Sequence, residues 1–214
     1  MRDLSDYSLK RHNTFGIDAR CRRFLEYETV EEAVDVAELL GREDSPFIII
    51  GGGSNLLLTR DFDGIVVHSA IKGYETDGTL MTCGSGMTWD DVVKVSLDSG
   101  LYGAENLSLI PGDVGASAVQ NIGAYGVEAK DLIREVECVE IASGRRCVLT
   151  NADCRYGYRQ SRFKQDWKNR YLITRVTYQF AADFTPRLDY GNIRAELQRR
   201  GIAEPTPQQL RQTI

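Results

Sequence analysis

Several classes of protein are excluded by what this sequence has little of. Cysteine is sparse, with 5 residues in 214, and no two of them have the C-x-x-C spacing of a metal or redox motif. The cysteine count is odd, which disfavours a disulfide framework, and only 2 histidines are present as possible further metal ligands, which disfavours a zinc site. The N-terminal residues contain no apolar signal segment, and no apolar run is long enough to cross a membrane. A reducing cytoplasm is therefore the expected compartment.

Positive charge is also scarce. Lysine and arginine number 26 against 31 acidic residues, so the net charge is −5 and the sequence pI is about 5.2. Proteins that bind nucleic acid need a dense basic face, which this balance does not provide. Glycine is in excess instead, with 20 residues of 214 against an average usage of about 7%. Most of that excess lies in short loops, as expected where backbone approaches a ligand.

The hydrophobic pattern predicts an α+β fold. A helix over residues 29–40 begins with a capping box of Thr29 and Glu32 and ends at Gly41, and a second helix covers residues 88–99. A strand with one buried face is predicted from alternating apolar residues near the end of the chain. The predicted strands cover residues 24–28, 47–50, 56–58, 65–67, 80–83, 133–141, 146–150 and 172–180, with a turn over residues 61–64.

Three consecutive glycines and two small polar residues follow the short apolar run over residues 47–50. In such a loop several backbone N–H groups converge on an anion, and the polar side chains add neutral donors. The dinucleotide fingerprint is excluded because its sixth position is a glycine, whereas the sixth position here is Leu56, and a P-loop is excluded because no Gly-Lys-Ser/Thr follows. A phosphate site and a tight turn both fit this loop, which comprises Gly51, Gly52, Gly53, Ser54 and Asn55.

A longer loop over residues 110–126 favours a ligand site more clearly. Five small residues line one short part of it, which suits a flat aromatic ligand against backbone, and Gln120 and Asn121 offer amide groups that read a ring edge. A loop that only fills a core seldom combines so many glycines with Asn, Gln and Ser. Two further segments, residues 154–164 and 189–192, are by themselves a basic surface and a turn before a helix.

The order of these segments resembles one family of flavoenzymes. The motifs are HNTFG at residues 12–16, GGGSN at 51–55, IPG with QNIGAYG within 110–126, and CRYGYRQSRFK at 154–164. Together they resemble the FAD-dependent UDP-N-acetylenolpyruvoylglucosamine reductases of peptidoglycan synthesis (the MurB family), and the match spans residues 12–193. The resemblance implies a two-lobed α+β FAD-binding fold like that of vanillyl-alcohol oxidase, with lobes at residues 1–70 and 71–200 and the third, substrate domain missing.

The same resemblance implies roles for individual residues. Arg159 matches the arginine near the flavin that contacts the substrate and helps to stabilise the enolate formed on hydride addition. A guanidinium held where negative charge develops is a physically reasonable device for that step. Tyr190 matches the substrate-contacting tyrosine of the family's first subtype. The residues implied to contact FAD are Gly51, Gly52, Gly53, Ser54, Asn55, Pro111, Gly112, Ser117, Asn121, Ile122, Gly123 and Tyr125.

The resemblance further implies a reaction in two halves. NADPH reduces noncovalently bound FAD, and the hydride then passes to the enolpyruvyl group of UDP-N-acetylglucosamine enolpyruvate to give UDP-N-acetylmuramate. The family's proton-donating serine belongs to a third domain, and its segment is absent from these 214 residues. Residues 201–214 are interpreted as the start of that domain, because Thr206 and Gln209 begin a helix with little length left. We expect a monomeric fragment that binds FAD but does not turn over alone, and that takes a small-molecule substrate without nucleic-acid or membrane partners.

Two other functions remain open at this point. A flavin oxidase of the same broad fold, acting on small alcohols or sugars, often tethers its flavin through histidine or cysteine. Only His12 and His68 are present, and neither lies in a predicted flavin loop, which argues against that class. The other alternative is a noncatalytic FAD-binding module. Release of flavin on denaturation separates the oxidases from the rest, and reduction by NADPH separates a catalyst from a passive binder.

Overall fold

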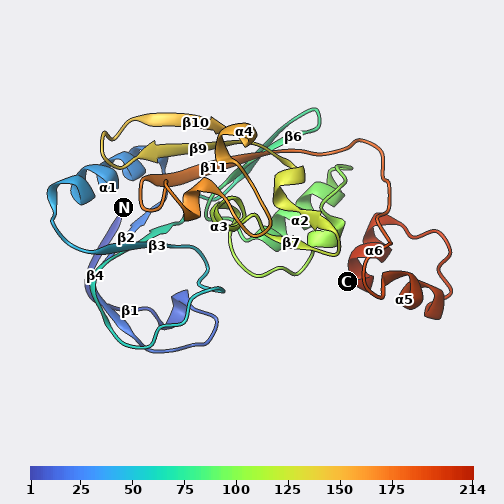
Figure 1. Ribbon diagram of the computed structural model, residues 1–214, viewed down its shortest axis with the longest axis horizontal. Coiled ribbons are helices and arrows are strands. Elements are labelled where there is room, and N and C mark those ends of the chain that lie inside the picture. The colour runs from blue at the N-terminus through green and yellow to red at the C-terminus, as the bar shows by residue number, and fades with distance from the viewer.

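A computed structural model describes residues 1–214, and most of its strands belong to two sheets (Figure 1). The strands of the first sheet are β1 (Arg2–Ser8), β2 (Arg20–Tyr27), β3 (Phe47–Ile50) and β4 (Phe62–Ser69). Their order is β1-β2-β4-β3, with β1 antiparallel to β2 and the other two pairs parallel. Helix α1 (Val30–Arg42) makes the crossover from β2 to β3, as a connection to a strand of a parallel set requires.

The second sheet is antiparallel throughout and contains five strands. They are β5 (Tyr74–Asp77), β6 (Leu80–Gly84), β9 (Ile133–Glu140), β10 (Arg146–Thr150) and β11 (Tyr171–Gln179). Their order is β10-β9-β11-β6-β5, so the long strand β11 lies at the centre. A short hairpin of β7 (Gly123–Ala124) and β8 (Val127–Glu128) stands apart from both sheets. The mixture of one partly parallel and one antiparallel sheet with helices confirms the predicted α+β class.

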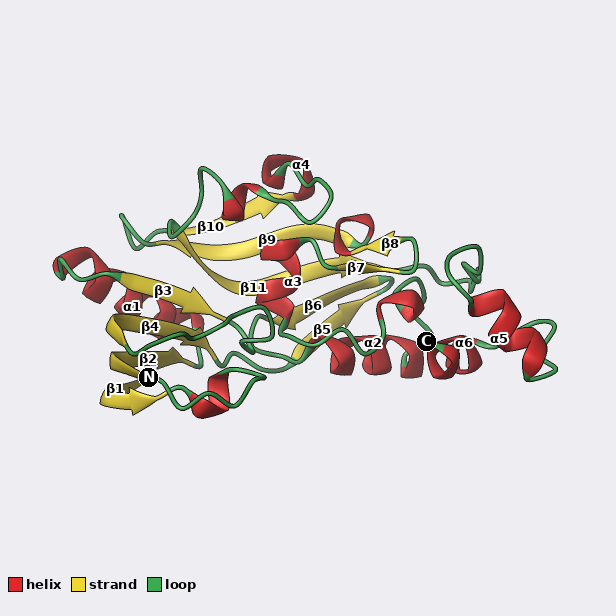
Figure 2. Cartoon of the chain, turned by 60° about the horizontal axis from the view of Figure 1, so that its bottom comes forward, coloured by secondary structure: helices red, strands yellow, loops and turns green.

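Helices pack along the second sheet and at one end of the molecule. The helices outside the first sheet are α2 (Trp89–Asp98), α3 (Val114–Gln120), α4 (Asn151–Cys154), α5 (Ile193–Arg199) and α6 (Pro207–Thr213). Four 3₁₀ turns accompany them: η1 (Lys10–His12), η2 (Glu105–Leu107), η3 (Ala129–Asp131) and η4 (Arg162–Lys164). Figure 2 shows α5 and α6 together at the end of the molecule where α2 lies. None of the helices combines the length and apolar character needed to span a membrane.

The two sheets share part of one core. The largest buried cluster lies within the second sheet and its helices, and includes Trp89 and Tyr178, whose rings meet edge to face at 5.4 Å. A second cluster joins both sheets through α1, because Leu25 of β2 and Leu172 of β11 belong to it together with Val36 of α1. Burial of these side chains, each worth about 1.5–3 kcal/mol, holds the sheets against one another.

Gly41 does not end the first helix as predicted. The helix continues to Arg42, and the chain turns to extended backbone at Glu43, whose N–H still donates to the carbonyl of Leu39. A glycine is tolerated within the last turn because nothing lies closer than 3.9 Å to the place where its Cβ would be. Pro46, four residues beyond the end of the helix, favours the extended backbone that replaces it.

The predicted strand over residues 56–58 is wrong, and so is the predicted turn over residues 61–64. Residues 56–58 form a loop. Leu56 and Leu58 pack against the core of the first sheet, where Leu58 is buried, whereas Leu57 is 63% exposed. Strand β4 already begins at Phe62. Its Gly64 is required by close approach rather than by a turn, because a Cβ there would lie 2.3 Å from the carbonyl oxygen of Pro46.

Helix α6 is tied to α2 by one bidentate ion pair. Arg211 donates from its two terminal nitrogens to the two carboxylate oxygens of Asp90, at 2.7 and 2.8 Å, and both side chains are largely buried. These hydrogen bonds hold the pKa of Asp90 well below its usual range. The predicted start of α6 is confirmed by a reciprocal capping box between Thr206 and Gln209.

We predict that Arg211→Ala lowers the free energy of unfolding by about 1 kcal/mol at neutral pH. The pKa of the Asp90 carboxyl is lower in the folded chain than in the unfolded chain, where it is near 3.9. Its ion pair therefore stabilises the fold fully at pH values above the unfolded-state pKa. That stabilisation is lost as the pH falls toward the folded-state pKa. Urea unfolding should therefore show a smaller difference between variant and wild type at about pH 3 than at pH 7. Arg194→Ala, which removes an exposed pair with Asp189, is the matched control and should change little.

Candidate functional site

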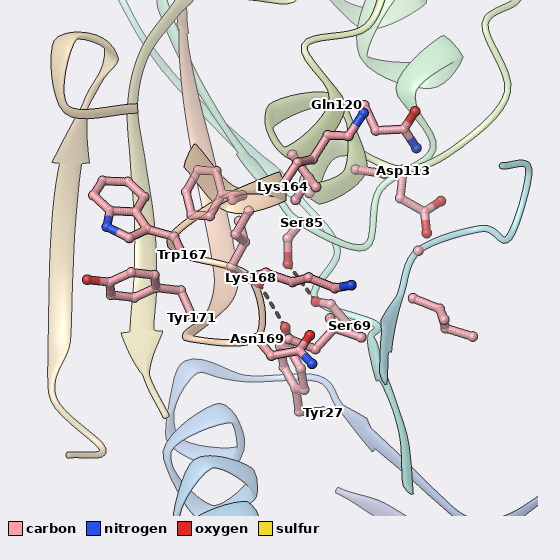
Figure 3. A pocket seen from close by; sticks show the side chains of 18 residues that line it. Tyr27, Ser69, Ser85, Asp113, Gln120, Lys164, Trp167, Lys168, Asn169 and Tyr171 are labelled. Atoms are coloured by element: carbon pink, nitrogen blue, oxygen red, sulfur yellow. Dashed lines mark hydrogen bonds between the residues drawn. The ribbon is translucent and has the colours of Figure 1, made fainter. Parts of the chain in front are cut away.

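A cavity of about 380 Å³ lies between the two sheets, within the size range of small-molecule sites, about 300–1,000 Å³ (Figure 3). The ends of β2, β3 and β4 contribute one side of it, and α3, η4 and β11 contribute the other. Half of its lining residues are hydrophobic. The residues that line it are Tyr27, Ile49, Ile50, Gly51, Ser69, Ser85, Asp113, Gly115, Ala116, Val119, Gln120, Phe163, Lys164, Trp167, Lys168, Asn169, Tyr171 and Ile173.

Hydrogen bonds across the seam between the sheets fix one wall of the cavity. The hydroxyl of Tyr27 on β2 donates to the carbonyl of Ile173 on β11 at 2.8 Å. Ser69 and Ser85 approach one another at 2.6 Å between their Oγ atoms, as the dashed line in Figure 3 marks. Burial raises the pKa of Tyr27 well above its usual value, so its hydroxyl keeps its proton and remains a donor.

The glycine loop, residues 51–55, directly follows β3 at the edge of this cavity. None of its five backbone N–H groups donates a hydrogen bond to another protein atom. Gly53 has a φ of +66°, and a Cβ at that position would lie 1.9 Å from the carbonyl oxygen of His12. The loop therefore packs tightly against the backbone at His12 while its own N–H donors have no protein partner, which is the arrangement that an anion requires.

The second predicted loop lies against the glycine loop. Ser54 donates from its Oγ to the carbonyl of Pro111 at 3.1 Å, and the amide of Asn55 donates to that of Gln120 at 3.1 Å. Gly51 faces Ala116 so closely that a Cβ on the glycine would lie 3.2 Å from the alanine Cβ. The structure thus brings together two segments that are about sixty residues apart in the sequence.

Three of the predicted cofactor residues have side chains that hydrogen-bond or pack within the protein itself. Ser117 is fully buried on α3, and its hydroxyl lies 2.7 Å from that of Tyr178. Asn121 is also fully buried, and it donates to the carbonyl of Gly157 while accepting from the N–H of Lys130. Ile122 packs in the core of the second sheet. These residues support the loop from behind, and direct contact between their side chains and a cofactor stays a prediction.

The remaining predicted residues gather beyond the C-terminal end of α3. Arg159 donates from Nη2 to the carbonyl of Gly123 at 2.6 Å. The rings of Tyr125 and Tyr190 meet edge to face at 6.4 Å, and Tyr190 is 59% exposed. We call these four residues the arginine–tyrosine surface.

Backbone strain is concentrated in the same segments. Seven residues other than glycine have a positive φ, and four of them lie in residues 110–126 and 154–164. They are Asn121, Tyr125, Arg155 and Arg159. Such residues cost about 1–3 kcal/mol each and cluster at ligand-binding and catalytic sites.

Positive charge reaches the cavity from the segment that follows Arg159. Lys164 and Lys168 both line the cavity, and Figure 3 shows the side chain of Lys168 extending into it. Lys164 donates to the carbonyl of Arg159 at 2.9 Å, which couples this wall to the arginine–tyrosine surface. Asp113 is the only acidic residue among those that line the cavity, so an anionic ligand is favoured there.

Sequence reasoning missed several of the lining residues. Phe163 and Lys164 lie inside the motif over residues 154–164, which was the available signal for them. Tyr27, Ser69 and Ser85 had no signal, because each is an ordinary strand or turn residue whose role depends on how the two sheets meet.

A family profile described as "FAD binding domain" matches residues 22–150, more than half of the chain. The chain belongs to this FAD-binding family. The match covers the glycine loop and the whole of the second loop, and FAD is the cofactor that the family implies.

Relatives of known identity extend the comparison. The chain is 48% identical over 198 residues to a UDP-N-acetylenolpyruvoylglucosamine reductase of Bacteroides fragilis, a match that covers 90% of this chain and 59% of that protein. It is 45% identical over 200 residues to the reductase of the same name from Neisseria gonorrhoeae, covering 91% of this chain and 56% of that one. The crystal structure of UDP-N-acetylenolpyruvylglucosamine reductase (MurB) from Thermus caldophilus superposes with a TM-score of 0.68 at 26% identity, covering 96% of this chain and 70% of the other. The FAD-binding chain therefore spans less than two thirds of the curated relatives it matches.

We predict that Gly53→Ala destabilises this FAD-binding chain more than Gly16→Ala does. Both glycines have a φ near +65°, but nothing lies within 4 Å of a Cβ built on Gly16. The Gly16 variant therefore measures the cost of the left-handed backbone alone, about 1–2 kcal/mol. The Gly53 variant adds the collision with the carbonyl of His12, so its thermal unfolding should begin at a clearly lower temperature. Equal losses in the two variants would contradict the tight packing of the glycine loop.

Proposed function

We propose that FAD lies across the seam between the two sheets, with its diphosphate on the glycine loop. The unpartnered N–H groups of residues 51–55 supply the donors, and Lys164 and Lys168 supply positive charge nearby. The family membership supports the cofactor, and the free donors support its placement. A larger side chain at Gly51 would meet Ala116 at 3.2 Å, so backbone is what a ligand meets there.

The two ends of the cofactor are proposed to occupy different surroundings. The cavity is bounded by Ile49, Phe163 and Ile173 and lies between the sheets, which suits the adenosine end. The redox-active ring has to meet both a hydride donor and a substrate, so it needs the exposed end of the site. The arginine–tyrosine surface provides that exposure, since Tyr190 is exposed and Arg159 lies at the surface.

The activity that this arrangement supports best is that of a UDP-N-acetylenolpyruvoylglucosamine reductase. FAD, when bound, accepts a hydride from NADPH and supplies it to the enolpyruvyl double bond of UDP-N-acetylglucosamine enolpyruvate. Arg159 is proposed to hold the substrate carboxylate and to stabilise the negative charge that builds on it. Its bond to the carbonyl of Gly123 fixes the guanidinium before the reaction, and Tyr190 contacts the substrate beside it. The names and identities of the curated relatives carry this proposal.

Residues 1–214 alone are proposed to bind FAD without completing the reaction. None of their serines lies in a segment like the one that donates the proton in this family; Ser54 and Ser117 already bond to Pro111 and Tyr178. All five cysteines are free, which agrees with the reducing cytoplasm in which we propose that the protein works as a monomer.

We predict saturable, noncovalent FAD binding that Gly52→Val weakens by at least about tenfold. The atoms nearest to a Cβ on Gly52 would belong to Asp113, at 3.3 Å, and Gly112, at 3.5 Å, so the fold can accept it with small shifts while the branched side chain obstructs the ligand. Fluorescence titration with FAD measures the affinity, and thermal unfolding of the apo chain should change little. Gly41→Val, on α1 with nothing nearer than 3.9 Å, is the control and should leave the affinity unchanged. An unchanged affinity in the Gly52 variant would support a structural turn instead.

The activity is tested by joining this chain to the residues of the Bacteroides fragilis relative that the match does not cover. The fused protein should oxidise NADPH in the presence of UDP-N-acetylglucosamine enolpyruvate, whereas residues 1–214 alone should bind FAD without substrate-dependent oxidation. Arg159→Ala in the fused protein should slow oxidation of reduced FAD by substrate roughly 10²–10³-fold and spare its reduction by NADPH. An equal loss in both half-reactions would mean that Arg159 acts structurally.

A further inference from the structure

A row of charged and titratable side chains leads from the edge of the first sheet to the glycine loop. Arg2 donates to the carboxylate of Glu26 at 2.6 Å, and the other oxygen of Glu26 lies 2.9 Å from Nδ1 of His68. The second ring nitrogen of His68, Nε2, lies 3.7 Å from Oδ2 of Asp113. The side chains of Glu26, His68 and Asp113 are 9, 13 and 14% exposed, so solvent screens them little.

Asp113 is the last of these charged groups, and it lies beside the proposed diphosphate site. Its two carboxylate oxygens lie 3.4 and 3.3 Å from the positions that a Cβ would take on Gly51 and Gly52. Asp113 is the N-cap residue of α3, yet its side chain accepts no capping hydrogen bond from the helix. The carboxylate is turned toward the glycine loop and His68 instead.

This geometry sets an electrostatic problem for an anionic ligand. A carboxylate that is mostly buried next to a diphosphate raises the free energy of the complex, because like charges repel strongly where water is excluded. His68 stands between two carboxylates, with one ring nitrogen directed at each. Only the imidazolium form has a proton for both, so the protonated ring is the form that can offset the charge of Asp113.

We propose that His68 is a positioning residue for FAD binding: its protonated ring holds Asp113 and neutralises it beside the diphosphate, so that binding of FAD is coupled to uptake of a proton. This inference rests on the proposed position of the diphosphate on the glycine loop. The neighbouring His12, whose ring centre is 5.0 Å from that of His68, is not the proton carrier. Burial lowers the pKa of His12, and the charge of His68 lowers it further.

The other groups that face His68 keep their charges over the same pH range. Burial acts to raise the pKa of Glu26, but hydrogen bonds from Arg2 and His68 hold it below its ordinary value. The pKa of Arg2 is raised by its hydrogen bond to Glu26. The coupling therefore depends on His68 and Asp113. Because the bound anion favours the protonated ring, FAD should bind more tightly as the pH falls and more weakly as the pH rises.

The test is a series of FAD titrations of residues 1–214 between about pH 5.5 and 8.5, with fluorescence as the readout. Wild-type affinity should fall by about tenfold over this range, within the usual size of a coupling between two sites. Asp113→Asn should bind more tightly than wild type at the alkaline end and lose most of the pH dependence. His68→Gln should bind weakly at every pH, and His68→Gln combined with Asp113→Asn should recover affinity. Asp98→Asn, the same change of charge at an exposed position on α2, should keep the wild-type profile.

The outcomes separate this inference from the proposed function. A wild-type affinity that does not vary with pH, or an Asp113→Asn variant that keeps the full pH dependence, would overturn the role of His68 while leaving FAD binding intact. Absence of saturable binding at every pH, or binding that Gly52→Val leaves unchanged, would overturn the proposed position of the cofactor itself. If His68→Gln fails to fold, Asp113→Asn alone still decides, because it removes the repulsion that the proposal depends on.

Discussion

The hydrogen bond from the hydroxyl of Tyr27 to the carbonyl of Ile173 is the contact on which the site depends, because it joins the two sheets at the wall of the cavity. Both partners are largely or fully buried, so an unsatisfied hydroxyl or carbonyl here would cost about 1–3 kcal/mol. The seam is reinforced by Ser69 and Ser85 and by the apolar side chains that both sheets share with α1. Each sheet supplies only part of the cavity, so the site exists only while the sheets stay together.

The position of the glycine loop depends on that seam, because the loop is attached to elements of both sheets. It leaves β3 in the first sheet, and Ser54 and Asn55 tie it to the segment that carries α3 on the second sheet. Gly53 brings the loop against the carbonyl of His12, which limits its freedom further. Beyond α3, Asn121 bonds the segment that carries Arg159 to the second loop, residues 110–126. One continuous set of short contacts therefore runs from the cavity to the arginine–tyrosine surface.

Much of this arrangement could be predicted from the sequence, because it depends on local chemistry. The capping residue Thr29, the hairpin of β9 and β10, and the capping box of α6 each follow from residues close together in the chain. The fold class followed from the hydrophobic pattern and the family from motifs long enough to be specific, and the family profile confirms the FAD-binding assignment. Helix α3 was not predicted, since its small residues over positions 114–120 give no apolar period of their own and are shaped by packing against the second sheet.

The parts that the sequence could not reveal all depend on distant contacts. Nothing local distinguishes Gly64, a close-approach position, from a turn glycine, because the atom it avoids belongs to Pro46. In the same way His68 and Asp113 are ordinary residues of two separate segments until the sheets meet. A buried pair of charged groups such as this one can be recognised only when the tertiary contacts of both residues are known.

The central claim is that the FAD diphosphate rests on the glycine loop between the two sheets, and a crystal structure of residues 1–214 with FAD tests it most directly. The account predicts phosphate oxygens within hydrogen-bond distance of the N–H groups of residues 51–55, the adenosine end in the cavity beside Tyr27 and Ile173, and the ring system near Arg159. FAD bound elsewhere, or bound with those N–H groups still unpartnered, would contradict it.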